Sequence, residues 1–133
     1  MNKILLAYDG GEPARRALEL TVDLANRYAI PVGVVSVTPV RAGRTPMDPW
    51  DDREVHDGEL HDAQTILRAH GIEPELLAPM GDPARTIEKI ALQGGFDTIV
   101  IGSRDLGGIS RVLQGSTSEH VATHAAATVI VAR

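Results

Sequence analysis

A glycine-rich stretch near the C-terminal end of the chain, residues 102–118, has the residue types of an anion-binding loop. Glycine lets the backbone approach a ligand closely and adopt positive φ angles. The stretch leads into a helix that we expect over about residues 116–125, whose first turn presents unpaired N–H groups and the positive end of the helix dipole. These features suit a phosphate group. The candidate ligands in the stretch are Gly102, Ser103, Arg104, Asp105, Gly108, Gly115, Ser116, Thr117 and Ser118.

Two of these side chains have a second interpretation. Ser116 and Glu119 form the S-x-x-E pattern of a capping box, so the Ser116 hydroxyl either caps the helix or binds a ligand. Arg104 either neutralises a phosphate or is an exposed loop arginine, which is the more common situation. Both alternatives stay open at the level of sequence.

Further candidate ligands follow the other apolar runs, at the points where strands are expected to end. In a parallel sheet, ligands bind beyond the carboxyl ends of the strands, where the strand order reverses. Asp9 follows the first run, Thr38 and Pro39 follow the second, and Met80 follows the third. Asp9 also precedes a glycine, and Asp-Gly is a strong turn pair, so Asp9 is either a ligand or a turn residue.

Short apolar runs alternate with helical patterns along the whole chain, which predicts an α/β fold with a mostly parallel sheet. We expect strands at residues 4–8, 31–37, 72–78, 96–101 and 128–132. Helices are expected at about residues 13–28, 55–69, 83–93 and 116–125, and a long proline-containing loop from residue 38 to about residue 53. Pro74 favours an edge position for the third strand.

Composition narrows the class of protein. The chain has 133 residues, an ordinary share of hydrophobic residues (43%) and a net charge of −5, which predicts one domain over residues 1–133. Without a Lys/Arg cluster, and with only 3% aromatic residues, binding of nucleic acid is not expected. The chain has neither a cysteine nor an apolar run long enough to span a membrane, so we expect a cytoplasmic protein.

Neither catalysis nor a metal site is predicted. The chain has no nucleophile elbow and no G-x-x-x-x-G-K-[ST] motif, so hydrolase chemistry and a Walker-type ATPase lack support. Several titratable side chains share the second helix, where we expect a hydrated outer face and not a metal site. They are His56, Asp57, Glu59, His61, Asp62 and His70.

The glycine-rich stretch resembles the ATP-binding motif of the universal stress protein family: glycine, two residues, glycine, nine residues, then glycine and a serine or threonine. Here Gly102 is followed after two residues by Asp105, and after nine more by Gly115 and Ser116. The resemblance covers essentially the whole chain. It implies a three-layer, doubly wound, Rossmann-like fold of the adenine nucleotide alpha hydrolase type, with a five-stranded parallel sheet in the order 3-2-1-4-5.

The resemblance also implies a function and a set of contacts. ATP would bind with its phosphates on residues 102–118 and its adenine near Asp9 and residues Val37, Thr38 and Pro39, in a small, non-enzymatic regulatory module. From the apolar edge at residues 129–131 we expect a homodimer through the C-terminal strand. A nucleotide-free dimer that acts through protein contacts and a weak ATPase remain the alternatives.

Asp105 departs from the family pattern, because it stands where the ATP-binding branch has its second glycine. Its carboxylate would repel a phosphate about 4 Å away by roughly 1 kcal/mol in water and by several at lower dielectric. A carboxylate can also help to hold Mg²⁺ beside phosphates, and Asp tolerates a left-handed backbone better than most residues. Asp105 therefore either weakens ATP binding or supports it through a cation.

Overall fold

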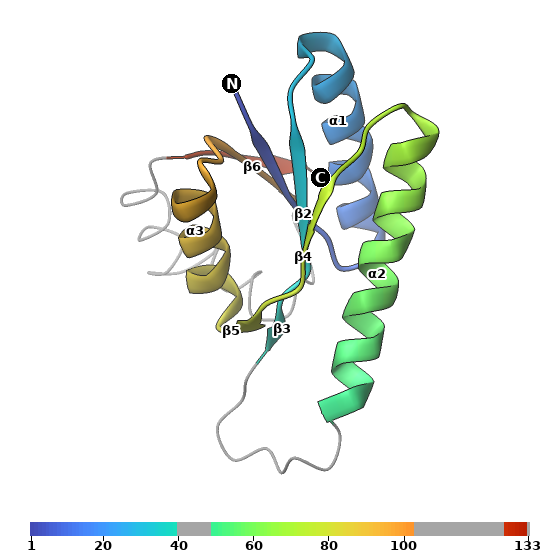
Figure 1. The fold of residues 1–133 in the computed structure, drawn as a ribbon, viewed down its shortest axis with the longest axis vertical. Helices are drawn as coiled ribbons and strands as arrows, with labels where there is room; N and C mark the ends of the chain where they lie inside the picture. Colours follow the sequence, from blue (N-terminus) through green and yellow to red (C-terminus); the bar gives the residue numbers. More distant parts are fainter. Residues whose placement is uncertain (40–48, 103–126, 133) are drawn as a thin grey trace.

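The structure of the chain, a computed structural model, describes residues 1–39, 49–102 and 127–132. The main sheet has five parallel strands in the order β4-β2-β1-β6-β7 (Figure 1). Counted along the chain, this is the predicted order 3-2-1-4-5, which the structure confirms. The strands of this sheet are β1 (Ile4–Ala7), β2 (Val32–Val35), β4 (Glu75–Leu77), β6 (Thr98–Gly102) and β7 (Thr128–Ala132).

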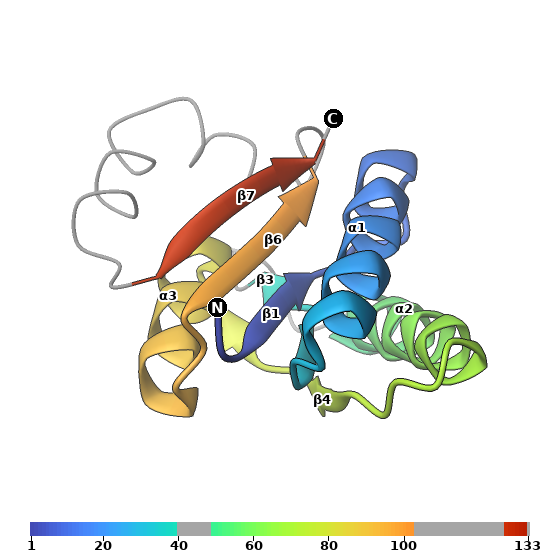
Figure 2. The ribbon, with the colours of Figure 1, turned by 90° about the horizontal axis from the view of Figure 1, so that it is seen from above.

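Helices cover both faces of the sheet, as the predicted three-layer architecture requires. Helices α1 (Glu12–Tyr28) and α2 (Pro49–Ala69) lie on one face, and α3 (Pro83–Gly94) lies on the other (Figure 2). In β1, Ile4 and Leu6 belong to the core on the α1 and α2 side, whereas Leu5 and Ala7 belong to the core on the α3 side. Successive side chains of a strand point to opposite faces, so a strand covered on both faces is apolar throughout.

Helix α3 begins and ends where the sequence predicts. Asp82 is its N-cap and accepts a hydrogen bond from the backbone N–H of Arg85 (3.1 Å), and Pro83 is the first helical residue. Gly95 closes the helix with a φ of 72°, a left-handed conformation that glycine adopts without steric cost. Among the described residues, no helix combines the length and the apolar character needed to cross a membrane.

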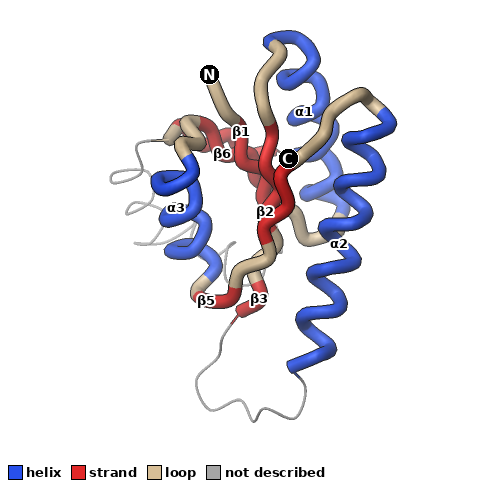
Figure 3. The backbone as a smooth tube through the Cα atoms, in the orientation of Figure 1, coloured by secondary structure: helices blue, strands red, loops and turns tan. Residues whose placement is uncertain are grey.

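The structure corrects the prediction of a long loop from residue 38 to about residue 53. Residues Thr38–Pro39 form a short strand, β3, which pairs in parallel with β5 (Met80–Gly81) beside the main sheet (Figure 3). Helix α2 begins at Pro49 and not near residue 55. Pro49 is the first helical residue, a position that proline favours because the first N–H groups of a helix have no intrahelical partner. The proline that suggested a loop therefore starts the helix.

Four of the five predicted strands of the main sheet differ from the structure only in their limits. Strand β4 is shorter than residues 72–78 and lies at the sheet edge, as Pro74 predicts. The helix expected over residues 116–125 lies outside the described residues.

The ring of Phe96 fills the space left by two glycines at the amino end of the sheet. A Cβ atom on Gly33 would lie 2.6 Å from Phe96 Cζ, and one on Gly94 would lie 2.5 Å from Phe96 Cε2. Lys3 Nζ lies 4.3 Å from the ring centroid and donates a hydrogen bond to the Gly94 carbonyl oxygen (2.7 Å). This packing joins the end of α3 to β2 at the edge opposite the predicted ligand site.

Candidate functional site

The strand order reverses between β1 and β6, so this pair marks the point where a parallel sheet binds ligands. The two strands pair in register, with Ala7 opposite Ile101. Asp9 therefore follows the end of one strand beside Gly102, the last residue of the other. Two of the predicted ligands, far apart in the sequence, therefore lie at the same edge of the sheet.

Gly102 has a packing role that holds whether or not a ligand is present. A Cβ atom at this position would lie 2.6 Å from the Pro13 carbonyl carbon and 2.8 Å from the Ala14 backbone nitrogen. These are backbone atoms in the first turn of α1, so they cannot rotate away as a side chain can. Glycine thus allows the end of β6 to lie directly against the start of α1, which brings the N-terminus of that helix to the candidate site.

Asp9 forms a turn with its own backbone. Its Oδ1 atom accepts a hydrogen bond from the Gly11 N–H (2.9 Å), and Gly10 between them has a φ of 81°. The turn interpretation of Asp9 is therefore confirmed. The contact uses one carboxylate oxygen, and a carboxylate has several acceptor positions, so a role toward a ligand is compatible with it.

The predicted residues that follow the second and third runs lie side by side, because β3 pairs with β5. Thr38 lies opposite Met80 in this small sheet, and the Thr38 N–H donates to the Pro79 carbonyl oxygen (2.9 Å). Val37 and Thr38 are buried, whereas Met80 is 60% exposed. Pro39 is the second residue of β3. The backbone pairing thus brings together two segments that the sequence suggested separately.

Three polar side chains that the sequence did not identify as site residues meet next to this edge. Ser36 Oγ lies 2.6 Å from His56 Nδ1 and donates a hydrogen bond to Glu59 Oε2 (2.8 Å). His56 Nδ1 lies 2.9 Å from the same Glu59 oxygen. Only 18% of the His56 side chain and 14% of the Glu59 side chain are exposed, so the prediction of a hydrated outer face is wrong for these two residues.

A signal for this cluster was present in the helical spacing of α2. The buried residues Leu60, Ala63 and Leu67 form a stripe along the helix. Extending that stripe by one turn toward the N-terminus leads to His56 and Glu59, because residues three and four apart lie on the same helix face. Because both residues are polar, the sequence favoured the outer face of the helix for them, and their position on the inner face was missed.

Burial raises the pKa of Glu59 above the ordinary value of a glutamate, and the nearby Asp9 carboxylate raises it further. The hydrogen bonds with Ser36 and His56 and the charge interaction with His56 lower the pKa of Glu59 without reversing the effect of burial. Tyr8, in the same neighbourhood, also has a raised pKa, mainly because it is buried. The side of the edge formed by β1 and β2 therefore carries two adjacent carboxylates in a partly desolvated position.

The remaining predicted ligands lie outside the described residues, so the structure does not place them relative to Asp9 and Gly102. They are Ser103, Arg104, Asp105, Gly108, Gly115, Ser116, Thr117 and Ser118.

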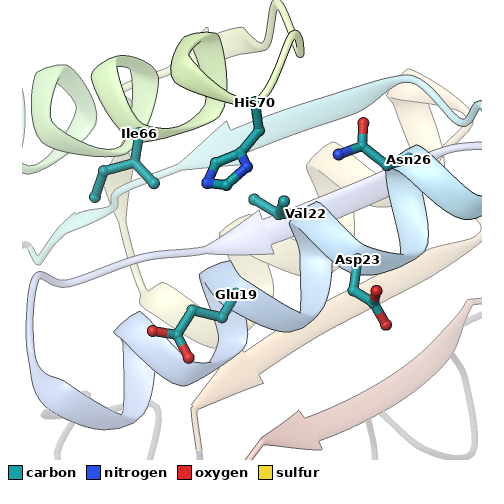
Figure 4. Close-up of a pocket in the computed structure, with 6 residues that line it drawn as sticks. All are labelled: Glu19, Val22, Asp23, Asn26, Ile66 and His70. Carbon is teal, nitrogen blue, oxygen red and sulfur yellow. The ribbon is translucent and has the colours of Figure 1, made fainter.

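A groove of about 300 Å³ lies elsewhere, between the C-terminal halves of α1 and α2 (Figure 4). Val22 and Ile66 contribute its apolar part, and Glu19, Asp23 and His70 contribute polar groups. The carboxyl edge of the main sheet is the better candidate for a ligand, because the strand order reverses there.

Fold and edge define a doubly wound α/β domain, with the switch point of its sheet between β1 and β6. The family model described as "Universal stress protein family" matches residues 1–133. The chain belongs to the universal stress protein family.

Individual relatives agree with this family. Universal stress protein YxiE of Bacillus subtilis is 25% identical and matches 99% of each chain. The solved universal stress protein UspA from Lactobacillus plantarum is 28% identical, with a TM-score of 0.72, and the match covers 99% of this chain and 97% of that one. The universal stress protein from Archaeoglobus fulgidus, solved in complex with dAMP, is 24% identical, with a TM-score of 0.75 over 100% of this chain and 98% of that one.

Two further structures share the fold at lower identity, and both contain a nucleotide. One is a universal stress protein in complex with cAMP, at 17% identity and a TM-score of 0.74. The other is an Arabidopsis thaliana family member with AMP bound, at 21% identity and a TM-score of 0.64. The matches cover 99% of this chain and 97% and 91% of those chains, respectively.

Proposed function

We propose that this chain binds an adenine nucleotide at the carboxyl edge of β1, β2 and β6. The observation that carries the proposal is the position of Asp9 and Gly102 at the switch point of the sheet, where Gly102 lets the N-terminus of α1 approach the end of β6. The neighbours solved with dAMP, cAMP and AMP support the ligand class, because these three ligands share an adenine, a pentose ring (ribose or deoxyribose) and one phosphate.

In the proposed arrangement, the adenine and ribose lie near Asp9, Val37 and Thr38, and the phosphates lie on residues 102–118. The first group is the part of the edge with buried apolar surface and a carboxylate that can accept hydrogen bonds from ribose hydroxyls. The nucleotide that we propose is ATP, with Mg²⁺ held beside its phosphates by Asp105. The carboxylate of Asp105 would then face a cation and not a bare phosphate.

Two measurements test the ligand. The purified protein, once denatured, should release a nucleotide that is detected by absorbance and mass. Isothermal titration with ATP, ADP and AMP should show binding. Absence of binding by all three at millimolar concentration, together with absence of a retained nucleotide, would contradict the proposal.

Variants of Asp9 separate its turn role from a ligand role. Asp9→Asn keeps an oxygen that can accept the hydrogen bond from Gly11 N–H but removes the charge. We expect Asp9→Asn to weaken ATP binding by about tenfold to a hundredfold, the range expected for a hydrogen bond to a charged group. Wild-type affinity in Asp9→Asn, with loss only in Asp9→Ala, would leave Asp9 as a turn residue.

We further propose that the protein is cytoplasmic and that the nucleotide regulates it and is not a substrate. The supporting observation is the lack of a nucleophile elbow and of a Walker motif in the sequence. The alternative, a weak ATPase, would use Asp105 as a base near the γ-phosphate. Turnover of ATP that is measurable in the wild type and lost in Asp105→Ala would favour the alternative.

We also propose a homodimer through β7. This strand lies at the edge of the main sheet, and Val131 on it is 43% exposed. An apolar edge strand readily pairs with a second copy of itself. Light scattering should show a dimer at micromolar concentration, and Val131→Lys should shift it toward the monomer. A wild-type protein that is monomeric under these conditions would contradict the dimer.

The nucleotide-free dimer remains the second candidate function, because Asp105 stands where the resembled motif has glycine. Asp105→Gly distinguishes the two candidates. A large gain of ATP affinity in Asp105→Gly over a non-binding wild type would favour the nucleotide-free function.

A further inference from the structure

Two segments of the carboxyl edge carry the residues that we assign to the nucleoside half of the ligand: the turn at residues 9–11 and the segment at residues 37–39. The last backbone hydrogen bond between β1 and β2 runs from the Tyr8 N–H to the Val35 carbonyl oxygen (3.0 Å). No backbone hydrogen bond joins residues 9–11 to residues 37–39, both of which the structure describes. Strand pairing therefore does not set the distance between these two segments.

A single side chain from α2, that of Glu59, spans the two segments. A Cβ atom added to Gly10 would lie 3.4 Å from Glu59 Cγ, so the stem of this side chain lies against the turn. Its Oε2 atom accepts a hydrogen bond from Ser36 Oγ (2.8 Å), and Ser36 directly precedes Val37. Glu59 thus connects the turn after β1 to the start of the segment that follows β2.

Hydrogen bonds and packing hold Glu59 in this bridging position. Its Oε2 atom also lies 2.9 Å from Nδ1 of His56, one turn earlier on α2, and Ser36 Oγ lies 2.6 Å from the same nitrogen. A carboxylate only accepts hydrogen bonds, so the His56 ring donates from Nδ1. Ser36 is buried, and so is Leu60, the neighbour of Glu59 on α2. A reorientation of Glu59 would leave buried polar groups without partners, which is costly.

A fixed separation between the two segments matters for a ligand that contacts both. The nucleoside that we propose lies between Asp9 on one side and Val37 and Thr38 on the other. Groups that are already held where the ligand needs them lose less conformational entropy when it binds. A change in the separation would weaken the contacts on both sides at once.

We infer that Glu59 is a positioning residue of the nucleotide site. With Ser36 and His56, it holds the Asp9 turn and residues 37–39 at the separation that the nucleoside half of the ligand requires. The inference rests on the proposed function. Glu59 acts through the two segments and does not itself need to touch the ligand.

Hydrogen exchange tests the positioning role without any ligand. The reporters are the backbone N–H groups of Gly11 and Thr38, which donate to Asp9 Oδ1 and to the Pro79 carbonyl oxygen (2.9 Å each). The N–H group of Phe96 is hydrogen-bonded to the last turn of α3 at the opposite end of the sheet, and it reports global opening.

Glu59→Ala removes the bridge. We expect exchange at Gly11 and Thr38 to accelerate at least about tenfold more than exchange at Phe96, because the two segments open locally while the core stays closed. Glu59→Gln keeps the length of the side chain and an oxygen that accepts the same hydrogen bonds, so it should restore slow exchange at both reporters. Asp57→Ala, which removes a carboxylate from an exposed position on the same helix, is the matched control.

Isothermal titration with AMP as the probe connects the positioning role to the ligand. We expect Glu59→Ala to weaken AMP binding about tenfold, the factor that corresponds to the net contribution of one ordinary hydrogen bond. Glu59→Gln and Asp57→Ala should both bind AMP within about threefold of the wild type, since neither breaks the bridge.

The outcomes separate the inference from the proposed function. Equal acceleration at all three amides in Glu59→Ala, or none at Gly11 and Thr38, would show that Glu59 does not position the two segments and would overturn the inference. Wild-type AMP affinity in Glu59→Ala, or a loss that Glu59→Gln does not recover, would also overturn it and leave the nucleotide site standing. A wild type that binds no adenine nucleotide would overturn both.

Discussion

Replacing Gly102 by alanine tests whether the end of β6 must lie directly against the start of α1. The added Cβ atom would lie 2.6 Å from the Pro13 carbonyl carbon, 2.8 Å from the Pro13 carbonyl oxygen and 2.8 Å from the Ala14 nitrogen. Carbon atoms in ordinary contact are about 3.5–4.0 Å apart, so the first turn of α1 and the end of β6 would have to separate by about 1 Å. Backbone atoms on both sides make this separation difficult.

The magnitude follows from two opposing effects. Forcing an extra methyl group into a packed interior destabilises a protein by about 1–3 kcal/mol. Replacing glycine by alanine also restricts the unfolded chain, which stabilises the fold by about 0.4–1 kcal/mol. We therefore expect Gly102→Ala to lower the free energy of unfolding by about 1–2 kcal/mol.

Urea denaturation followed by circular dichroism measures this change. The matched control is Gly58→Ala in α2, where an added Cβ atom meets no other atom within 4 Å. Alanine is the better helix former, so this control should raise the free energy of unfolding by about 0.5–1 kcal/mol. A Gly102→Ala protein as stable as the wild type would refute the close approach of β6 and α1. The displaced turn beside Asp9 should also lower nucleotide affinity in Gly102→Ala and not in Gly58→Ala.

Four further outcomes follow from the described contacts. Gly33→Ala places a Cβ atom 2.6 Å from the Phe96 ring and should destabilise the fold by about 1–3 kcal/mol, a loss that the double variant with Phe96→Leu should partly recover in urea denaturation. Asp82→Ala removes the N-cap of α3 and should cost about 0.5–2 kcal/mol in the same assay, whereas Asp82→Ser should retain most of the stability. Hydrogen bonds from the backbone N–H groups of Lys3 and Asn2 hold the pKa of Asp97 below its ordinary value. The stabilisation by Asp97 is therefore present above the pKa of the unfolded state and is lost as the pH falls through the lower pKa of the folded state. In an acid titration, Asp97→Asn should lose less stability than the wild type over this pH range. Glu59 behaves in the opposite way, because its folded pKa is raised: stability relative to Glu59→Gln should be greatest below the unfolded pKa and should decline as the pH rises through the raised value.

The fold was predictable because its signals are local and repeated. A strand buried on both faces needs a continuous apolar run, as in residues 4–7, and a helix end needs a left-handed residue, as at Gly95. The third strand was assigned to an edge from Pro74 alone. The start of α2 at Pro49 was missed because proline favours both loops and first helical residues, and local sequence does not distinguish the two situations.

The candidate site was predictable only in part. Asp9 and Gly102 were identified because they follow apolar runs, and strand order then brings them together. The pairing of β3 with β5 depends on contacts between residues about 40 positions apart, so no local sequence pattern predicts it. The motif suggested only that Gly102 contacts a ligand. It did not indicate that Gly102 leaves room for the backbone of α1.

By itself, the sequence determined the glycine-rich stretch at residues 102–118, its spacing and the alternation that defines the fold class. These features depend on residue types and on their spacing along the chain, and both are known without any tertiary contact. The tertiary structure alone decided which polar side chains lose water: Ser36, His56 and Glu59 form a cluster only because α2 packs its inner face against the end of β2. Burial and proximity arise from packing across distant segments, and they determine the pKa of Glu59, which composition and spacing do not.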